Sequence, residues 1–208
     1  MKNAPGGLAP SRQAGYGTPM DSPKTNPFRS LQDNASGLFS RILGKYGPEM
    51  ACASGCASCC AAEFSIHPGE AALILEEFLS LSESERQNIR ASWNNSRAGT
   101  CAFLVGNRCT TYASRPVICR TQGAPLCNSD EVTRTKRITA CSLNFKGGES
   151  LPSQPEDWFE LNRLTELQSV AEHFFEKTIG IPEVLQPLLD ADRRIPLRSL
   201  RDSLARLT

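Results

Sequence analysis

Four cysteines within nine residues constrain this chain more than any other feature. Cys52, Cys56, Cys59 and Cys60 form a C-x3-C-x2-C-C run, and the 208-residue chain holds nine cysteines in all. A thiolate is a soft, charged ligand, and several at short spacing bind zinc or iron better than they serve as isolated thiols. The run therefore predicts a metal centre.

Charge and hydropathy indicate where such a centre would operate. The chain has 23 Lys and Arg against 22 Asp and Glu, so no overall field favours nucleic acid, and we expect no nucleic-acid partner. The first 17 residues contain no apolar segment typical of a secretion signal, and no stretch approaches the roughly 20 apolar residues that span a membrane. We expect a soluble cytoplasmic protein with no membrane role. Disulfides seldom persist in that compartment, and the odd cysteine count also weakens the alternative of a disulfide framework.

The chain divides into three parts. Residues 1–34 are rich in Pro, Gly, Ser and Asn without periodicity, which predicts a disordered N-terminal arm. Residues 35–146 hold all nine cysteines and are expected to form the cysteine-cluster metal-binding domain. Residues 147–208 are expected to be C-terminal helices that pack on the same domain. The predicted fold class is mainly α with one small β-hairpin, a compact irregular domain organised around a cysteine-ligated metal centre.

Apolar spacing and helix-capping residues predict six helices. Ser82 and Glu85 form a capping box, in which each side chain can satisfy the other's free backbone donor. Gly47-Pro48 and Gly180-Ile-Pro182 are helix-ending sequences. The expected helices are 36–46, 68–79, 82–96, 157–178, 182–190 and 197–207.

The second cysteine group surrounds a predicted turn. Gly106-Asn107 suits a tight hairpin, which would place Cys101 and Cys109 at facing strand ends. One helical turn is expected at 117–120. The segment that carries Cys127 and Cys141 has no clear pattern.

The number of cysteines, compared with the four ligands that a typical site needs, predicts that eight of them bind metal. Adjacent side chains tend to diverge, so Cys59 and Cys60 suit two different sites or two edges of one cluster. Eight thiolates would suit two four-ligand zinc or iron–sulfur sites. Cys127 is left out, as a spare thiol, a further ligand or a redox-active residue. The predicted metal ligands are Cys52, Cys56, Cys59, Cys60, Cys101, Cys109, Cys119 and Cys141.

Three motifs carry a family resemblance. Besides the cysteine run, they are Cys109-x-x-Tyr-x-x-Arg-Pro-x-x-Cys-Arg120 and Cys141-Ser-Leu-Asn-Phe145. Residues 50–146 thus resemble the YkgJ-type cysteine-cluster family, a zinc- or iron-chelating CxxCxxCC domain. One departure is that three residues, not two, separate Cys52 from Cys56. The resemblance implies an iron–sulfur cluster or zinc. One branch is similar to flagellin lysine N-methylases that use S-adenosylmethionine.

The sequence leaves two classes of function open. The first is a metal-binding protein in electron transfer or metal chelation, with a protein partner that the sequence does not identify. The alternative is an enzyme, either a cluster-dependent oxidoreductase or an S-adenosylmethionine-dependent protein lysine N-methyltransferase. No general base, nucleophile pair or glycine-rich cofactor turn can be named, so no catalytic residue is assigned. The C-x3-C-x2-C spacing also resembles radical S-adenosylmethionine enzymes, but the alternating strand–helix pattern of their barrels is missing.

Several residues near the cysteines have a simpler interpretation than catalysis. Arg115 and Arg120 flank Cys119 and are expected to play a structural role beside it. Tyr112 is expected to be a cross-strand aromatic residue of the hairpin. His67 is expected to be a polar loop residue before a helix, rather than a ligand, and His173 to be solvated.

Overall fold

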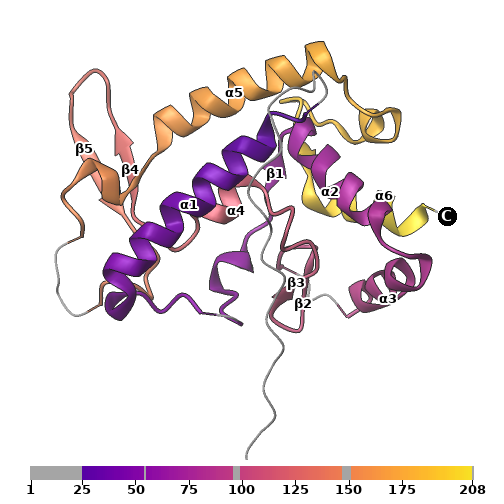
Figure 1. Cartoon of the computed structure of the whole chain (residues 1–208), viewed down its shortest axis with the longest axis horizontal. Coiled ribbons are helices and arrows are strands. Elements are labelled where there is room, and N and C mark those ends of the chain that lie inside the picture. The colour runs from indigo at the N-terminus through magenta and orange to yellow at the C-terminus, as the bar shows by residue number, and fades with distance from the viewer. Residues whose placement is uncertain (1–24, 54, 96–98, 147–150, 208) are drawn as a thin grey trace, which may run out of the picture.

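The computed structural model describes residues 25–53, 55–95, 99–146 and 151–207 (Figure 1). The arm predicted for residues 1–34 therefore lies mostly outside the described residues. The α-helices are α1 (Phe28–Tyr46), α2 (Pro68–Ser80), α3 (Glu83–Trp93), α4 (Val117–Thr121), α5 (Leu161–Thr178) and α6 (Leu197–Arg206). The 3-10 helices are η1 (Gly47–Glu49), η2 (Ser58–Ala61), η3 (Pro155–Asp157) and η4 (Glu183–Leu188).

The strands form three small sheets around these helices. Strand β1 (Ser65–Ile66) pairs antiparallel with β7 (Ile195–Pro196), and β2 (Leu104–Val105) pairs antiparallel with β3 (Arg108–Cys109). The third sheet has β4 (Leu126–Ser129) at its centre, antiparallel to β5 (Lys136–Thr139) and parallel to β6 (Phe159–Glu160). The mainly helical class is confirmed, with more strand pairing than the single predicted hairpin. The additional hairpin gave no sequence signal because β5 is largely exposed and lacks an apolar face.

Helix α1 begins well before its predicted start. Residues 28–34, which the sequence assigned to the arm, form its first turns. Phe28 is fully buried, and its backbone N–H donates to Asn26 Oδ1 at 3.0 Å. The Phe28 ring lies against Gly69, where a Cβ atom would come within 2.5 Å of it. This contact between distant segments orders the residues, and local composition does not reveal it.

The other helices follow their predicted boundaries closely. The Ser82–Glu85 capping box is confirmed, and the helix that it starts ends at Trp93, three residues before the predicted end. Helix α2 runs to Ser80 from Pro68, as its N-terminal proline predicted. Helix α5 ends before Gly180, which has a positive φ of 82°.

Two hydrophobic cores lie on either side of α2. The first core joins α2, α6, η4 and the β1–β7 pair with Trp93 and Phe103. The second core joins α1, α4 and α5, and it takes Leu73 from the other side of α2. Figure 1 shows α1 crossing the centre of the molecule, with α5 above it and α2, α3 and α6 to its right. The segment that follows α1 passes below that helix toward the β2–β3 hairpin, so the cysteine run lies near both cores.

Candidate metal centre

The cysteine run forms a chain of tight turns. The backbone N–H of Cys56 donates to Ala53 O at 3.0 Å, and the N–H of Cys60 donates to Ala57 O at 2.9 Å. Helix η2 contains both Cys59 and Cys60. All nine cysteines lie in the described part of the chain, and each is a free thiol.

Four cysteines are neighbours, three of them in or against the first core, and we call the four the inner group. The N–H of Cys101 donates to Cys60 O at 2.7 Å, which ties η2 to the segment before β2. Burial, together with the nearby thiols of Cys101 and Cys109, raises the pKa of Cys119 to about 12. Cys60 and Cys109 pack against the first core, of which Cys101 is a member. The inner group consists of Cys60, Cys101, Cys109 and Cys119.

The other four predicted ligands are Cys52 and three cysteines near it, and we call them the outer group. Cys52 packs against the second core. Burial raises its pKa, and the nearby thiols of Cys56, Cys141 and Cys59 raise it further. Cys56 is exposed, whereas the remaining members are half-buried. The outer group consists of Cys52, Cys56, Cys59 and Cys141.

Cys59 and Cys60 lie where the two groups meet. Their side chains hydrogen bond to each other, which lowers the pKa of Cys59 to about 6 and raises that of Cys60. Arg115 adds to the lowering at Cys59. Cys59 is therefore the first thiol of this pair to ionise. Cys60 interacts with Cys101 and Cys109 and completes the inner group, which leaves Cys59 for the outer one.

The thiols are neighbours, but they are not yet in ligand geometry. Within residues 25–53, 55–95, 99–146 and 151–207, no three His, Cys, Asp or Glu side chains are placed to hold one ion. The donor chemistry fits zinc or iron, since sulfur ligands suit both. A bound metal would have to draw these sulfurs together, so the ligand set predicted from the sequence stays a prediction.

Asn144 and Gly123 hold Cys52 in place. Asn144 is buried, and its Oδ1 accepts from the N–H of Ala51 at 2.8 Å. Its Nδ2 donates to Gly123 O at 2.6 Å and lies 3.4 Å from Cys52 Sγ. The Asn144 backbone N–H donates to Cys141 O at 2.9 Å, so this one residue links Cys141 to Cys52. Gly123 has a φ of 94°, and a Cβ there would overlap Cys52 Sγ.

Glu70 attaches α4, which carries Cys119, to the start of α2. Its carboxylate accepts from the N–H of Val117 at 2.7 Å and from the N–H of His67 at 3.2 Å. Burial raises the pKa of this carboxyl to about 7. The sequence analysis missed Glu70, although its place as the third residue after His67, the N-cap of α2, is a capping-box signal.

His67 differs from the expected polar loop residue. It is buried against Phe28, and its Nδ1 lies 3.7 Å from Glu172 Oε2. Burial lowers the pKa of His67 to about 4, with a contribution from Arg194. The expectation failed because the contacts come from α1 and α5, both remote in sequence. His173 is exposed, as predicted.

The arginines beside Cys119 have the expected structural role. Arg120 donates to Arg115 O and to Ser36 Oγ, both at 2.7 Å, and also to Ala113 O. It thereby joins α4 to α1. Arg115 stacks over Tyr112, with its guanidinium carbon 3.7 Å from the ring centroid. Tyr112 is 64% exposed and follows β3, so it is not the predicted cross-strand aromatic residue.

Cys127 lies apart in the third sheet. It is fully buried in β4, where it pairs with Ile138 of β5, and its Sγ is 3.8 Å from Ser129 Oγ. In Figure 1 this sheet lies at the left of the molecule, whereas the β2–β3 hairpin lies below its centre. This position agrees with leaving Cys127 out of the ligand set.

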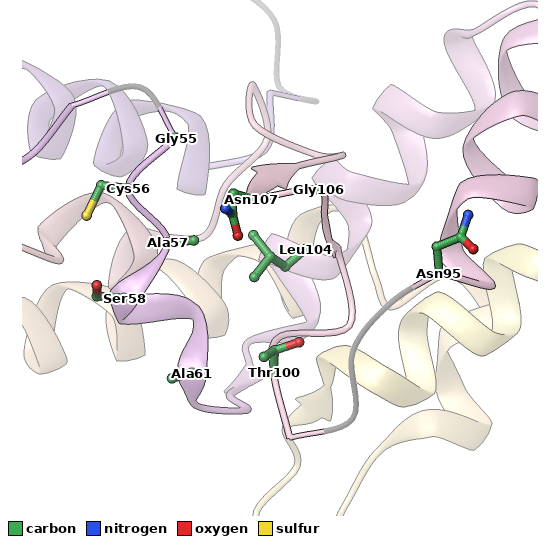
Figure 2. Close-up of a pocket in the computed structure, with 10 residues that line it drawn as sticks. All are labelled: Gly55, Cys56, Ala57, Ser58, Ala61, Asn95, Thr100, Leu104, Gly106 and Asn107. Atoms are coloured by element: carbon green, nitrogen blue, oxygen red, sulfur yellow. The ribbon is translucent and has the colours of Figure 1, made fainter.

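An open cleft separates the cysteine run from the β2–β3 hairpin. Its volume is about 610 Å³, and Gly55–Ala61 of the run face Leu104, Gly106 and Asn107 of the hairpin (Figure 2). The Cys56 side chain points away from the hairpin in this view. The cleft therefore gives solvent access to one wall of the cysteine run.

Comparison with known proteins finds one family model that matches part of the chain. Residues 51–142 match the family model CxxCxxCC, described as "Putative zinc- or iron-chelating domain". No curated protein and no solved structure matches the chain, so the expected similarity to flagellin lysine N-methylases gains no support. Across the described residues, every helix is too short or too polar to cross a membrane. Residues 51–142 are therefore similar to the CxxCxxCC family of zinc- or iron-chelating domains.

Proposed function

We propose that this chain binds zinc or an iron–sulfur cluster through eight cysteines, and that its function is metal chelation. One observation carries the proposal: segments 52–60, 101–119 and 141 are remote in sequence, yet their thiols are electrostatic neighbours. Thiolates in such proximity repel one another, and a bound cation would offset that repulsion by attracting each thiolate. The ligands in this proposal are Cys52, Cys56, Cys59, Cys60, Cys101, Cys109, Cys119 and Cys141.

Proton release is part of metal binding by thiols. A metal takes the thiolate, so each ligating cysteine loses its proton on binding. The pKa of Cys59 is lowered to about 6, which makes it the ready first ligand at neutral pH. The Cys119 thiol, with its pKa raised to about 12, gives up its proton only when the metal is present. Nine free thiols also suit a reducing compartment, and we propose the cytoplasm.

Anaerobic purification followed by iron, zinc and sulfide analysis tests the proposal. A brown protein with equal iron and sulfide would identify an iron–sulfur cluster, and a colourless protein with zinc would identify a zinc site. Replacing Cys127 with Ala should leave the metal content unchanged, because Cys127 lies in the third sheet. A folded, reduced chain that takes up neither iron nor zinc would contradict the proposal.

Electron transfer is a second candidate, supported by the exposure of the outer group. Cys56 is exposed at the wall of an open cleft, so a cluster at that site would lie close to the surface, within reach of a protein partner. A reversible one-electron couple in voltammetry of the iron-loaded chain is expected. A colourless zinc protein without such a couple would remove this candidate. No arrangement of the described residues favours the methyltransferase alternative, and we do not propose it.

A further inference from the structure

The eight proposed ligands do not form one centre. We propose that the inner and outer groups are two separate four-thiolate metal sites, the inner one closed and slow to exchange its metal, the outer one open and fast. This inference rests on the proposed function, since it divides the same ligands between two sites. It goes beyond the proposed function by naming the four cysteines of each site and by predicting different rates of metal exchange.

Packing separates the groups independently of their charge interactions. Cys101 belongs to the first core, and Cys60 and Cys109 pack against it. Cys52 instead packs against the second core. Cys60, Cys101 and Cys109 are thus supported by one part of the fold and Cys52 by another.

Backbone contacts hold the inner sulfurs from three directions. Cys101 is tied to Cys60 by a backbone hydrogen bond of 2.7 Å, and Cys109 sits on β3 opposite Leu104 of β2. The N–H of Leu104 in turn donates to Cys101 O at 3.0 Å. Glu70 fixes the first residue of α4, two residues before Cys119. A metal held here would have apolar side chains of the first core around it, which limits access of water and chelators.

The outer sulfurs depend on fewer and more exposed contacts. Asn144 joins Cys52 and Cys141 through its side chain and its backbone N–H. Cys56 is exposed and lies on the turn that begins at Ala53 O. A metal held here would face solvent on the side of Cys56. Cys59 and Cys60 are successive residues of η2 whose side chains hydrogen bond to each other, so the two proposed sites would meet at this pair.

Native mass spectrometry of the reduced full chain, loaded with zinc and freed of excess metal, counts the sites. We expect two zinc ions per chain in the natural protein and in the Cys127→Ala control. Cys141→Ser and Cys109→Ser should each retain one zinc, and the double variant none. Loss of both ions in either single variant, or saturation of the natural chain at one ion, would overturn the division into two sites. Absence of zinc and iron from the natural, folded chain would instead overturn the proposed function.

A second measurement needs no substitution and so remains valid if a variant fails to fold. The zinc-loaded natural chain is treated with a chelator and a thiol-alkylating reagent together, and modified cysteines are identified over time. Cys52, Cys56, Cys59 and Cys141 should become alkylated as one fast set, at least about tenfold faster than the inner group, because the outer group includes the exposed Cys56 and the inner group the buried Cys101. A single rate for all eight thiols, or a fast set of different membership, would overturn the inference.

Discussion

The inner and outer cysteine groups use the same ligand atom in two different settings. Cys60, Cys101 and Cys109 of the inner group lie in or against the first core. In the outer group, Cys52 lies against the second core and Cys56 is exposed. A metal in the inner group would offset the repulsion among thiolates near the core. Its binding free energy would therefore contribute directly to the stability of the folded chain. A metal in the outer group would organise a surface segment. On this proposal, the position of a thiol relative to the core would determine whether its metal is structural or exchangeable.

One ligand substitution in each group, compared by its effect on the free energy of unfolding, should show the largest difference between the two groups. Cys101→Ser should lower the free energy of unfolding of the zinc-loaded chain by on the order of 3–5 kcal/mol, because it removes a ligand inside the first core. Cys56→Ser should cost about 1 kcal/mol or less, since Cys56 is exposed. Urea unfolding monitored by circular dichroism gives both values. Equal losses would show that the two groups do not differ in their contribution to folding.

A glycine substitution can disrupt the outer group alone. Gly123→Ala should destabilise the chain by about 1–3 kcal/mol, since Ala is strained at a φ of 94° and its Cβ would displace Cys52. The variant should lose the outer zinc and keep the inner one, as metal analysis would show.

Helix α1 offers a matched control for that substitution. Gly44 has open space around its Cβ position, so Gly44→Ala should leave both metals bound and raise stability by up to about 1 kcal/mol. If Gly123→Ala kept both zinc ions, the assigned position of Cys52 in the outer site would be contradicted.

Removal of the Asn144 amide should weaken the outer site without destroying it. Asn144→Ala removes the donor beside Cys52 Sγ, and loss of such supporting contacts typically lowers metal affinity about 10–100-fold. Competition with a chelating dye would measure the affinity of each site. The exposed Asn128 serves as the control, because Asn128→Ala should change neither affinity. An equal loss at both sites would show that Asn144 supports the fold as a whole.

The pH dependence of stability tests the attachment of α4 near the inner group. The folded pKa of Glu70 is raised to about 7 from an ordinary 4.5, so the folded chain binds this proton more tightly than the unfolded chain. Its contribution to stability is therefore complete below about pH 4.5 and is lost as pH rises through 7. The difference in unfolding free energy between the natural chain and Glu70→Gln should follow this course, with an amplitude on the order of 1–3 kcal/mol.

Taking that difference largely cancels the titration of neighbouring groups. The pKa of Glu172 is raised to about 7 and that of His67 is lowered to about 4, both chiefly by burial, and both residues remain in the variant. Chemical unfolding at intervals between pH 4 and 8 supplies the data. A difference that does not change with pH would show that Glu70 is not protonated in the folded chain near neutrality.

Local signals in the sequence were sufficient for most of the secondary structure. The Ser82–Glu85 capping box and the prolines at helix starts act over one turn, so they are readable without tertiary contacts. Gly106 and Asn107 both take positive φ, as the predicted hairpin turn requires. The first turns of α1 were missed because Phe28 is buried by a residue more than forty positions away.

The division of the cysteines could be predicted only in part. Divergence of adjacent side chains, a local property of the backbone, predicts that Cys59 and Cys60 serve two different sites or two edges of one cluster. Which distant cysteine joins each of them depends on how the cores pack, and neither spacing nor residue type encodes it. Asn144 and Glu70 act on backbone atoms of remote segments, so their roles became visible only in the fold.

Titration of the reduced, metal-free chain with cobalt tests the central claim most directly, that these cysteines bind metal. Cobalt replaces zinc in thiolate sites, and thiolate-to-cobalt absorption bands report sulfur ligation. The account predicts that such bands, with the intensity of tetrahedral sites, grow until two cobalt ions are bound per chain and disappear when zinc is added. A folded chain that shows no thiolate-to-cobalt absorption would contradict it.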